Sequence, residues 1–330
     1  MRRVLVVGAG FFGGLVTRRL RDDGIAPLVA TRRGADVRLD AEDDASVAAV
    51  LREGDVIVDT AGPFASRTTR LLRAAIERRC DVVDLAESLA WSEAVLALDA
   101  RAAENGVRVY PACSAVAAVT GACIRASGIA APESVDQFLA PASAETASPA
   151  TVRGFVRSIG LPIRTLRDGR IVTVRGYVET RAFPAGPHRG GIVENAGAVL
   201  LPWAWPTMRR ADLWVDPNTP LAQAALGVAA RHDRIASLAR SLAPRIGAGP
   251  LASRAGEYTV AVSDGARAIA FRLSAPRGSY LIATEPAAIV AAELARRRPL
   301  RGGVMLPDAQ VEPETLFERL RSLGIDIARA

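Results

Sequence analysis

The first third of the chain alternates between two patterns of apolar residues. Short, nearly continuous apolar runs, typical of strands buried on both faces of a sheet, stand at residues 4–7, 27–31, 37–40, 56–59, 81–85 and 107–110. Between them, apolar residues recur at the spacing of helices in residues 15–20, 43–51, 66–79 and 91–104. Strands that alternate with helices in this way predict a parallel, doubly wound sheet of the Rossmann type.

The pattern changes near residue 130. Beyond this point, strand-like segments are predicted at residues 135–139 and 170–181, and a hairpin at residues 257–262 and 266–274. Helical spacing returns in residues 151–159, 222–243, 286–298 and 314–323, whereas residues 141–149 have the composition of a loop. Residues 183–220 hold six prolines and three tryptophans. This composition favours a loop-rich aromatic region that lines a pocket or a subunit contact.

The first predicted strand runs directly into the glycine motif VLVVGAGFFGG, which has GxGxxG spacing. In a dinucleotide site, Gly8 permits the tight turn out of the strand, and Gly10 lets the backbone approach a pyrophosphate. Gly13 lets the helix pack closely on the strand, and the helix start at Phe11 and Phe12 offers N–H groups to the phosphates. These five residues are therefore predicted to bind a cofactor. Two alternatives are a turn that binds nothing and a secretory signal, whose apolar segment would have to pass three glycines.

The end of the second predicted strand bears on which nicotinamide cofactor is preferred. An NAD site usually places an acidic residue there for the ribose 2′-hydroxyl, whereas an NADP site places arginine nearby for the 2′-phosphate. The residues here are Thr31, Arg32 and Arg33, and a guanidinium can pair with phosphate through two hydrogen bonds. We predict that these residues, with Asp40, bind NADP (NADPH). An accidental arginine pair is the alternative, because arginine is abundant throughout the chain.

A second cofactor-binding segment is predicted just after residues 56–59. It comprises Ala61, Gly62, Pro63 and Phe64. Loops at the carboxyl ends of parallel strands carry the ligand contacts of a doubly wound sheet. This loop is therefore the candidate wall beside the nicotinamide, with a plain strand-to-helix turn as the alternative.

The patterns together predict an α/β fold with an N-terminal Rossmann-type doubly wound parallel sheet and a second α+β domain for substrate binding and dimerisation. We expect the NADP-binding domain in residues 1–128 and the substrate domain, with one antiparallel sheet, in residues 129–285. The C-terminal helices of residues 286–330 could pack back on the first domain. The active site is expected in the cleft between the two domains.

Composition and charge exclude several classes of function. The chain has 42 basic residues and a net charge of +7 but contains no lysine, which excludes Schiff-base and P-loop lysine chemistry. Its arginines are spread over every region, so no nucleic-acid partner is expected. Three cysteines without CxxC spacing, and two distant histidines, predict reduced thiols and no metal site. No apolar run approaches the roughly 20 residues that span a bilayer, which predicts a cytoplasmic protein without a membrane partner.

Four residues are candidates for catalysis, each with a structural alternative. Asp84 and Glu87, at the end of a predicted strand, could orient a ribose or donate a proton, or could satisfy N–H groups at a helix start. Tyr177 is a candidate acid, although a core tyrosine is favoured. Histidine is the residue type suited to proton transfer near neutral pH, and His188 stands in a loop with glycine and proline, although a surface position is favoured. Cys113 is expected to be a packed thiol rather than a nucleophile.

Three motifs resemble the NADP-binding domain of the saccharopine dehydrogenase-like reductases: VLVVGAGFFGG, VIVDTAGPF and, after a helix, VVDLAES. Residues 148–170 and the tail of residues 303–325 are similar to segments of the short members of that family. The sequence departs from the family at Val83, where an aromatic residue is usual, and near Ser148, where the helix entry is usually glycine-rich. These departures leave the substrate open, because family members reduce imines, enoyl groups or ketimine adducts.

The resemblance implies an NADPH-dependent oxidoreductase that reduces a C=N or an activated C=C bond of a small metabolite by hydride transfer. Two alternatives stay open: a non-catalytic sensor that binds the dinucleotide, and an assembly protein whose tryptophan- and proline-rich region binds another protein.

An exposed apolar patch or sheet edge is often covered by a symmetry mate. We therefore also expect a homodimer that forms through the second domain.

Overall fold

The computed structural model describes residues 1–146, 149–219, 221–246, 252–297 and 302–329. The chain folds into two compact units, the first with residues 1–121 and 283–312 and the second with residues 122–282 and 313–330. The change of unit thus occurs at residue 121, and the segment of residues 286–330 is divided between the two units. Ser148 and Arg298, the last residue of an expected helix, lie outside the described residues.

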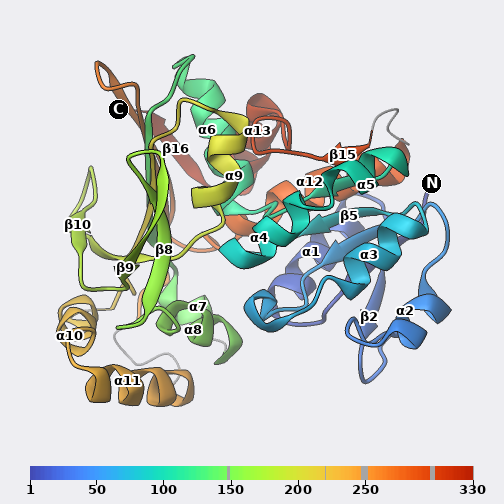
Figure 1. The fold of residues 1–330 in the computed structure, drawn as a ribbon, viewed down its shortest axis with the longest axis horizontal. Helices are drawn as coiled ribbons and strands as arrows, with labels where there is room; N and C mark the ends of the chain where they lie inside the picture. The colour runs from blue at the N-terminus through green and yellow to red at the C-terminus, as the bar shows by residue number, and fades with distance from the viewer. Residues whose placement is uncertain (147–148, 220, 247–251, 298–301, 330) are drawn as a thin grey trace. The chain divides into compact units, whose positions relative to one another are not determined.

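The first unit is built around a parallel sheet, which confirms the predicted Rossmann-type fold class (Figure 1). Among the described residues the sheet has seven strands in the order β15-β6-β5-β4-β1-β2-β3, and β1 to β6 follow the strand order of a Rossmann sheet. The strands are β1 (Val4–Val7), β2 (Leu28–Thr31), β3 (Val37–Arg38), β4 (Val56–Asp59), β5 (Asp81–Asp84), β6 (Arg108–Tyr110) and β15 (Gly303–Val304). The three central strands are buried along their whole length, because helices cover both faces of the sheet.

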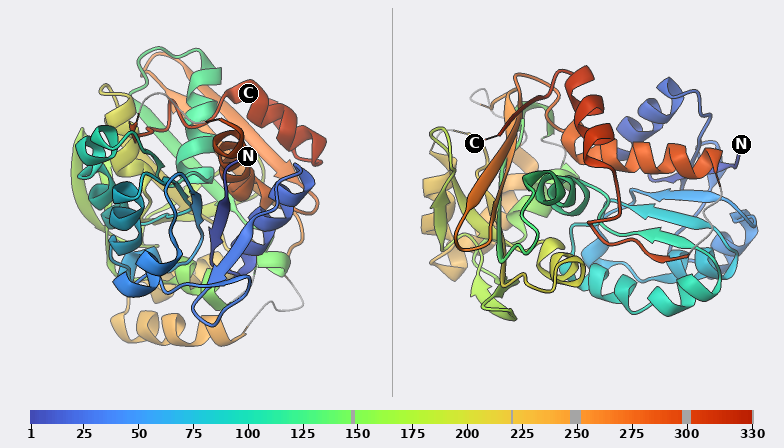
Figure 2. Two further views of the ribbon diagram at one scale, coloured as in Figure 1. Left: turned by 90° about the vertical axis from the view of Figure 1, so that its right-hand side faces the viewer. Right: turned by 90° about the horizontal axis from the view of Figure 1, so that it is seen from above.

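Helices α1 and α12 lie on one face of this sheet, and α4 and α5 on the other (Figure 2, right). The helices are α1 (Phe11–Asp22), α2 (Asp44–Val50), α3 (Arg70–Glu77), α4 (Leu89–Leu96), α5 (Asp99–Glu104), α12 (Leu281–Arg296) and the start of α6 (Thr120–Ser127). The single helix expected at residues 91–104 is divided because the chain turns at Leu98, whose side chain is buried. The helix expected from residue 66 begins only at Arg70, after a short 3-10 turn (Phe64–Ser66).

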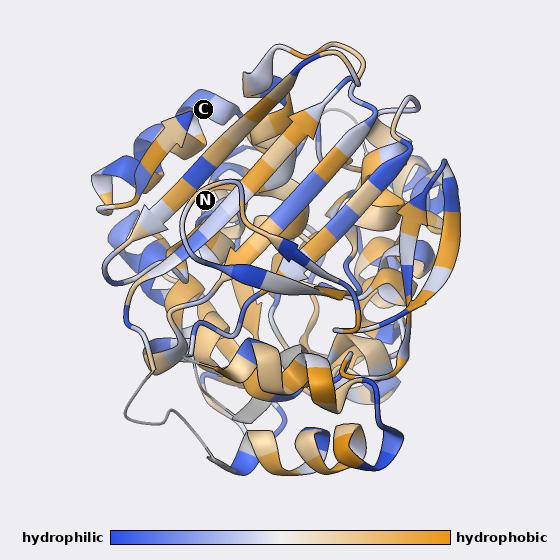
Figure 3. Ribbon diagram, turned by 90° about the vertical axis from the view of Figure 1, so that its left-hand side faces the viewer, coloured by the Kyte–Doolittle hydropathy of each residue, from blue (hydrophilic) through white to orange (hydrophobic). Residues whose placement is uncertain are grey.

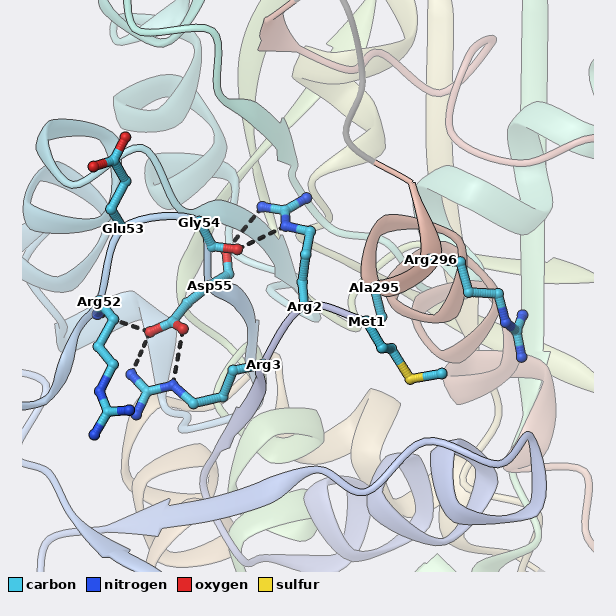
Figure 4. A pocket seen from close by; sticks show the side chains of 9 residues that line it. All are labelled: Met1, Arg2, Arg3, Arg52, Glu53, Gly54, Asp55, Ala295 and Arg296. Atoms are coloured by element: carbon cyan, nitrogen blue, oxygen red, sulfur yellow. Dashed lines mark hydrogen bonds and ion pairs between the residues drawn. The ribbon is translucent and has the colours of Figure 1, made fainter.

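Arg2 and Arg3, which precede β1, form hydrogen bonds with residues at the amino-terminal ends of the neighbouring strands (Figure 4). The Arg3 guanidinium donates to both carboxylate oxygens of Asp55, at 2.8 and 2.5 Å, and Arg2 donates to the carbonyl of Gly54 and, at 2.5 Å, to the carboxylate of Asp81. A hollow of about 490 Å³ beside them is lined by Met1, Arg2, Arg3, Arg52, Glu53, Gly54, Asp55, Ala295 and Arg296. Ligands of doubly wound sheets bind at the opposite, carboxyl ends of the strands. This hollow is therefore separate from the expected cofactor site.

The second unit contains a mixed sheet, whose strands carry alternating apolar and polar residues (Figure 3). Among the described residues its strands are β7 (Ser134–Ala140), β8 (Pro162–Arg167), β9 (Arg170–Arg175), β10 (Thr180–Ala182), β11 (Arg189–Val193), β12 (Arg210–Val215), β13 (Gly256–Ser263), β14 (Ala268–Ala275) and β16 (Asp326–Arg329). Seven of them follow the order β10-β11-β12-β7-β13-β14-β16, and β8 joins β9 to β12.

The helices of the second unit alternate with these strands along the chain. They are α7 (Ser143–Thr146), α8 (Pro149–Val156), α9 (Gly197–Ala204), α10 (Ala222–Ala229), α11 (Asp233–Ile246) and α13 (Pro313–Ser322), with the end of α6. The helix expected at residues 222–243 is divided into α10 and α11. In the described part of the chain, no helix combines the length and the apolar character needed to cross a bilayer.

The predicted hairpin is confirmed as the antiparallel pair β13 and β14, but the expectation of one antiparallel sheet is wrong. Strands β7 and β12 pair in parallel over their whole shared length. The connection between them includes β8 to β11 and α7 to α9, so it is long enough to return the chain to the end of the sheet where β7 begins. The sheet is mixed for this reason.

The predicted loop-rich region at residues 183–220 contains three regular elements that the sequence analysis did not predict. This segment forms β11, α9 and β12, and β12 lies inside the sheet between β11 and β7. Trp214, on β12, is 4 % exposed and packs in a core cluster with Phe138 and Phe183, whereas Trp203 on α9 is 60 % exposed. The prolines misled the prediction because several of them stand between elements, as Pro206 does. The loop expected at residues 141–149 likewise contains the short helix α7.

We expect Trp214→Ala to lower the free energy of unfolding by about 3–5 kcal/mol, because it removes a large buried ring. The substitution also deprives the buried carboxylate of Asp136 of the Trp214 indole N–H, which donates to it at 3.1 Å. Trp203→Ala is the matched control and should change the free energy by no more than about 0.5 kcal/mol. Urea unfolding measures both values, and equal losses would contradict this placement of the two rings.

Candidate functional site

The glycine turn after β1 is closed so tightly that two of its positions exclude a side chain. Gly8 has a φ of +105°, and a Cβ placed there would lie 2.8 Å from the Thr60 hydroxyl oxygen. A Cβ on Gly13 would lie 2.1 Å from the Gly8 carbonyl oxygen. The Thr60 hydroxyl donates to the carbonyls of Val7 and Gly8 at 2.9 and 3.2 Å, so the turn is also tied to the loop after β4.

The N-terminus of α1, which directly follows the glycine turn, is accessible to a ligand. Gly10 is exposed, and a Cβ placed on it would have no atom within 4 Å. Gly10 stands at the N-cap without a side-chain hydrogen bond, and the first turn, which begins with Phe11 and Phe12, contains no acidic residue. No carboxylate of this turn therefore competes for the positive end of the helix dipole. This is the environment that a pyrophosphate requires.

Strand β2 ends at Thr31 and is followed by Arg32 and Arg33, both exposed. The turn is closed by the Gly34 N–H, which donates to the Thr31 carbonyl at 3.1 Å. Asp40, which follows β3, accepts the Glu42 N–H at 3.0 Å through its carboxylate. Asp40 therefore stabilises its own turn, and the two arginines are the charged groups that β2 presents at its end.

The loop after β4 is held by the carboxylate of Asp59. Ala61 donates its N–H to Asp59 Oδ1 at 3.1 Å, and the Gly62 N–H donates to the carbonyl of Thr60 at 3.1 Å. Gly62 and Pro63 are exposed, whereas the ring of Phe64 contacts Trp91 edge to face with 5.0 Å between centroids. The loop thus presents backbone and proline to solvent and fixes its one aromatic ring inward.

Asp84, the last residue of β5, is fully buried and holds three segments together. Its Oδ1 accepts the N–H groups of Ala86 and Ala112 at 3.0 and 2.8 Å, and its Oδ2 accepts the Trp91 indole N–H at 2.9 Å. Burial raises the pKa of Asp84 to about 6, and these three donors oppose the shift. Glu87 is exposed in the loop that follows. Both oxygens of Asp84 are thus occupied, by two N–H groups from loops and by the indole of Trp91.

The other two catalytic candidates belong to the second unit. Tyr177 is buried between β9 and β10 with a φ of +63°, and burial raises the pKa of its hydroxyl. His188 is half-buried between β10 and β11, with its Nδ1 3.2 Å from a carboxylate oxygen of Asp216 and its ring 5.4 Å from that of Phe183. The structure therefore brings together Asp84 and Glu87 in one unit, and places Tyr177 and His188 in the other.

Three polar residues near the glycine turn and the loop after β4 were not predicted. They are Thr60, Arg67 and Glu42, which connect β1, β4 and the segment after β3. Thr60 could have been found, because it follows a predicted strand end directly. Glu42 carries no local signal, because its partners Arg67 and Thr68 lie 25 and 26 positions away, and Arg67 matches no motif in a chain rich in arginine. The Cys113 thiol is buried with a raised pKa, and no cluster that could hold a metal occurs among the described residues.

Comparison with known proteins gives a match of the N-terminal segment to one family model and a fold shared with solved structures. Residues 4–109 match the family model of the saccharopine dehydrogenase NADP binding domain. The apo saccharopine dehydrogenase (L-Glu forming) of Saccharomyces cerevisiae has a similar structure, with 15% identity, coverage of 100% of this chain and 99% of that chain, and a TM-score of 0.62. GenD2 from gentamicin A biosynthesis, solved with NAD, matches with 16% identity, coverage of 100% and 97%, and a TM-score of 0.41. No curated protein matches the chain.

The glycine turn gives a paired test on neighbouring residues. Gly13→Ala should lower the free energy of unfolding by at least about 1–3 kcal/mol, because its methyl group overlaps the Gly8 carbonyl. Gly14→Ala, on the next residue of α1, meets no atom within 4 Å and should stabilise the helix by about 0.5–1 kcal/mol. Urea denaturation separates the two, and a Gly13→Ala protein as stable as Gly14→Ala would disprove the close approach.

The raised pKa of Asp84 predicts how stability changes with pH. The native carboxyl holds its proton up to about pH 6, whereas the unfolded one loses it near 3.8, so the native state binds more protons between these values. The contribution of Asp84 is therefore greatest at low pH and falls as pH rises through this window. The difference in unfolding free energy between wild type and Asp84→Asn should drop by up to about 3 kcal/mol from pH 4 to pH 7. A difference that stays constant or grows with pH would contradict the assignment.

Proposed function

We propose, from the premise that residues 4–109 form an NADP-binding domain of the saccharopine dehydrogenase type, that the chain is an NADPH-dependent oxidoreductase. The proposed reaction is reduction of a C=N or an activated C=C bond of a small metabolite by hydride transfer. The observation that carries the proposal is the accessible N-terminus of α1, which follows a glycine turn with no room for a side chain at Gly8 and Gly13. A dinucleotide pyrophosphate is the ligand that this arrangement fits.

Each part of the proposed cofactor site has a defined role. The N–H groups at the start of α1 bind the pyrophosphate, and Arg32 and Arg33 bind the 2′-phosphate of the adenosine ribose. The loop that contains Gly62 and Pro63 lines the nicotinamide side. The bound nicotinamide supplies the hydride, so the protein has to orient the substrate and provide a proton.

Proton delivery is the remaining chemical task. Of the four candidates, Asp84 is buried with both oxygens occupied, and Tyr177 is buried with a raised pKa. Glu87 and His188 are the two whose side chains reach solvent. We therefore assign proton transfer to Glu87 or His188, and assign to Asp84 the positioning of the loops after β5 and β6.

Turnover is the direct test of the proposed activity. Purified protein should oxidise NADPH, followed by its absorbance, in the presence of cyclic imines or enoyl thioesters, and the substrate that works identifies the reduced bond. A protein that binds NADPH but oxidises it with neither class would be the sensor rather than the enzyme. A homodimer is proposed to form through the second unit, and light scattering measures it.

We expect Arg32→Ala to weaken NADPH binding by roughly one to two orders of magnitude. A charge-assisted hydrogen bond to the 2′-phosphate contributes about 1.5–3 kcal/mol, and about 1.4 kcal/mol corresponds to tenfold in affinity. NADH lacks this phosphate, so its affinity should hardly change. The measurement is calorimetric titration with both cofactors at fixed moderate salt, because salt screens phosphate contacts.

Arg21→Ala is the matched control for the change in net charge. Arg21 is exposed in the last turn of α1, at the end of the helix opposite the glycine turn. It should leave the affinities for both cofactors unchanged. Equal losses of NADPH and NADH in Arg32→Ala, or a wild-type protein that binds NADH as tightly as NADPH, would overturn the role of Arg32.

A further inference from the structure

A buried arginine underlies the loop after β4. The Arg67 side chain is only 8 % exposed, and its Nη1 donates to both carboxylate oxygens of Asp59 at 2.8 Å. The same nitrogen donates to the carbonyl of Ala61 at 2.9 Å. One guanidinium therefore holds the end of β4 and the first part of the loop that follows it.

Cation–π contacts of this arginine connect the loop to α4. The Arg67 Cζ lies 5.3 Å from the ring centroid of Phe64 and 5.5 Å from that of Trp91. Trp91 in turn donates its indole N–H to Asp84 at 2.9 Å. Because a guanidinium close to an aromatic ring is attracted by the electron density of the ring, Arg67 links the end of β4 through Trp91 to the buried carboxylate at the end of β5.

The other end of the arginine reaches the segment after β3. Arg67 Nε lies 3.3 Å from Glu42 Oε1, and Glu42 also accepts the N–H and the hydroxyl of Thr68, at 3.2 and 2.7 Å. Glu42 follows Asp40 by two residues, on the adenosine side of the proposed cofactor site. The network of Asp59, Arg67 and Glu42 thus joins that side of the site to the loop on the nicotinamide side.

We propose that Arg67 is a positioning residue that holds the loop of residues 61–64 in the conformation that binds the nicotinamide half of the cofactor. The inference rests on the proposed function, because it concerns the same site. A purely structural ion pair would support both halves of the cofactor alike. Most of the contacts of Arg67 instead go to Asp59, Ala61 and Phe64, in the segment proposed to line the nicotinamide side. Its remaining ion pair goes to Glu42, which Thr68 also holds through two hydrogen bonds.

The test compares a whole cofactor with its adenosine half. Adenosine 2′,5′-bisphosphate carries the 2′-phosphate of NADPH but no nicotinamide. The double variant Asp59→Asn/Arg67→Met removes both charges together, so that no unpaired charge is left buried. We expect it to bind NADPH roughly tenfold more weakly or worse, which corresponds to the loss of one charge-assisted anchor. Its affinity for adenosine 2′,5′-bisphosphate should stay that of the wild type.

Two comparisons make the result specific to Arg67. Arg70→Met changes the same residue type three positions later, where the side chain is 47 % exposed and pairs with Asp44 at the surface. It should leave both affinities unchanged. Arg32→Ala should instead weaken the binding of both ligands, because each of them carries the 2′-phosphate.

Calorimetric titration of the folded proteins, with folding checked by circular dichroism, decides the matter. A double variant that keeps wild-type affinity for NADPH overturns the proposal. Parallel loss of both ligands also overturns it, since Arg67 would then support the unit as a whole. If the wild-type protein binds neither adenosine 2′,5′-bisphosphate nor NADPH, the proposed function itself is overturned, and the inference with it.

Discussion

The first unit depends on the absence of a side chain at Gly13. A single methyl group there would lie 2.1 Å from the carbonyl oxygen of Gly8, so only hydrogen allows α1 to begin so close to the end of β1. The same contact brings the Thr60 hydroxyl within hydrogen-bonding distance of Val7 and Gly8. The start of the helix, the turn before it and the loop after β4 therefore have one fixed arrangement. The open space above Gly10 is a consequence of that arrangement.

Two buried carboxylates extend this rigidity across the sheet. Asp59 and Asp84 are register partners at the ends of β4 and β5, and burial raises the pKa of each, although Arg67 opposes the shift at Asp59. Such charges are costly to bury unless donors surround them. Most of their donors come from the segments that follow them, namely Arg67 and the Ala61 N–H for Asp59, and Trp91 and the Ala86 N–H for Asp84. The Ala112 N–H, from the segment after β6, also donates to Asp84. The strand ends thus determine the conformation of their own loops.

How much the sequence predicts differs between the two units for a physical reason. Strands β1 and β4 were predicted at their observed bounds, because a parallel strand buried on both faces is a continuous apolar run. Strand β12 was missed because buried Asp212 and Trp214 stand among polar residues and prolines, and its parallel pairing with β7 is a long-range contact that no local pattern reveals.

The same limit applies within the candidate site. The glycine spacing is local, so Gly8, Gly10 and Gly13 could be assigned from sequence. Arg67 is one of 42 basic residues, and its partner Glu42 lies 25 positions away, so nothing in the sequence distinguishes it. Burial likewise separates Asp84 from Glu87, although the two are only three residues apart.

The first unit is discontinuous in the chain, which matters while the protein is being made. Domains generally fold as they leave the ribosome, beginning with the N-terminal one. Here the backbone N–H of Arg2 donates to the carbonyl of Ala295 at 2.8 Å, and Arg19 lies 3.0 Å from the buried carboxylate of Glu285. Strand β15, which covers the edge of β6, comes later still, at Gly303–Val304. The nascent first unit therefore has to wait, with the edge of β6 unpaired, until almost the whole polypeptide has been translated.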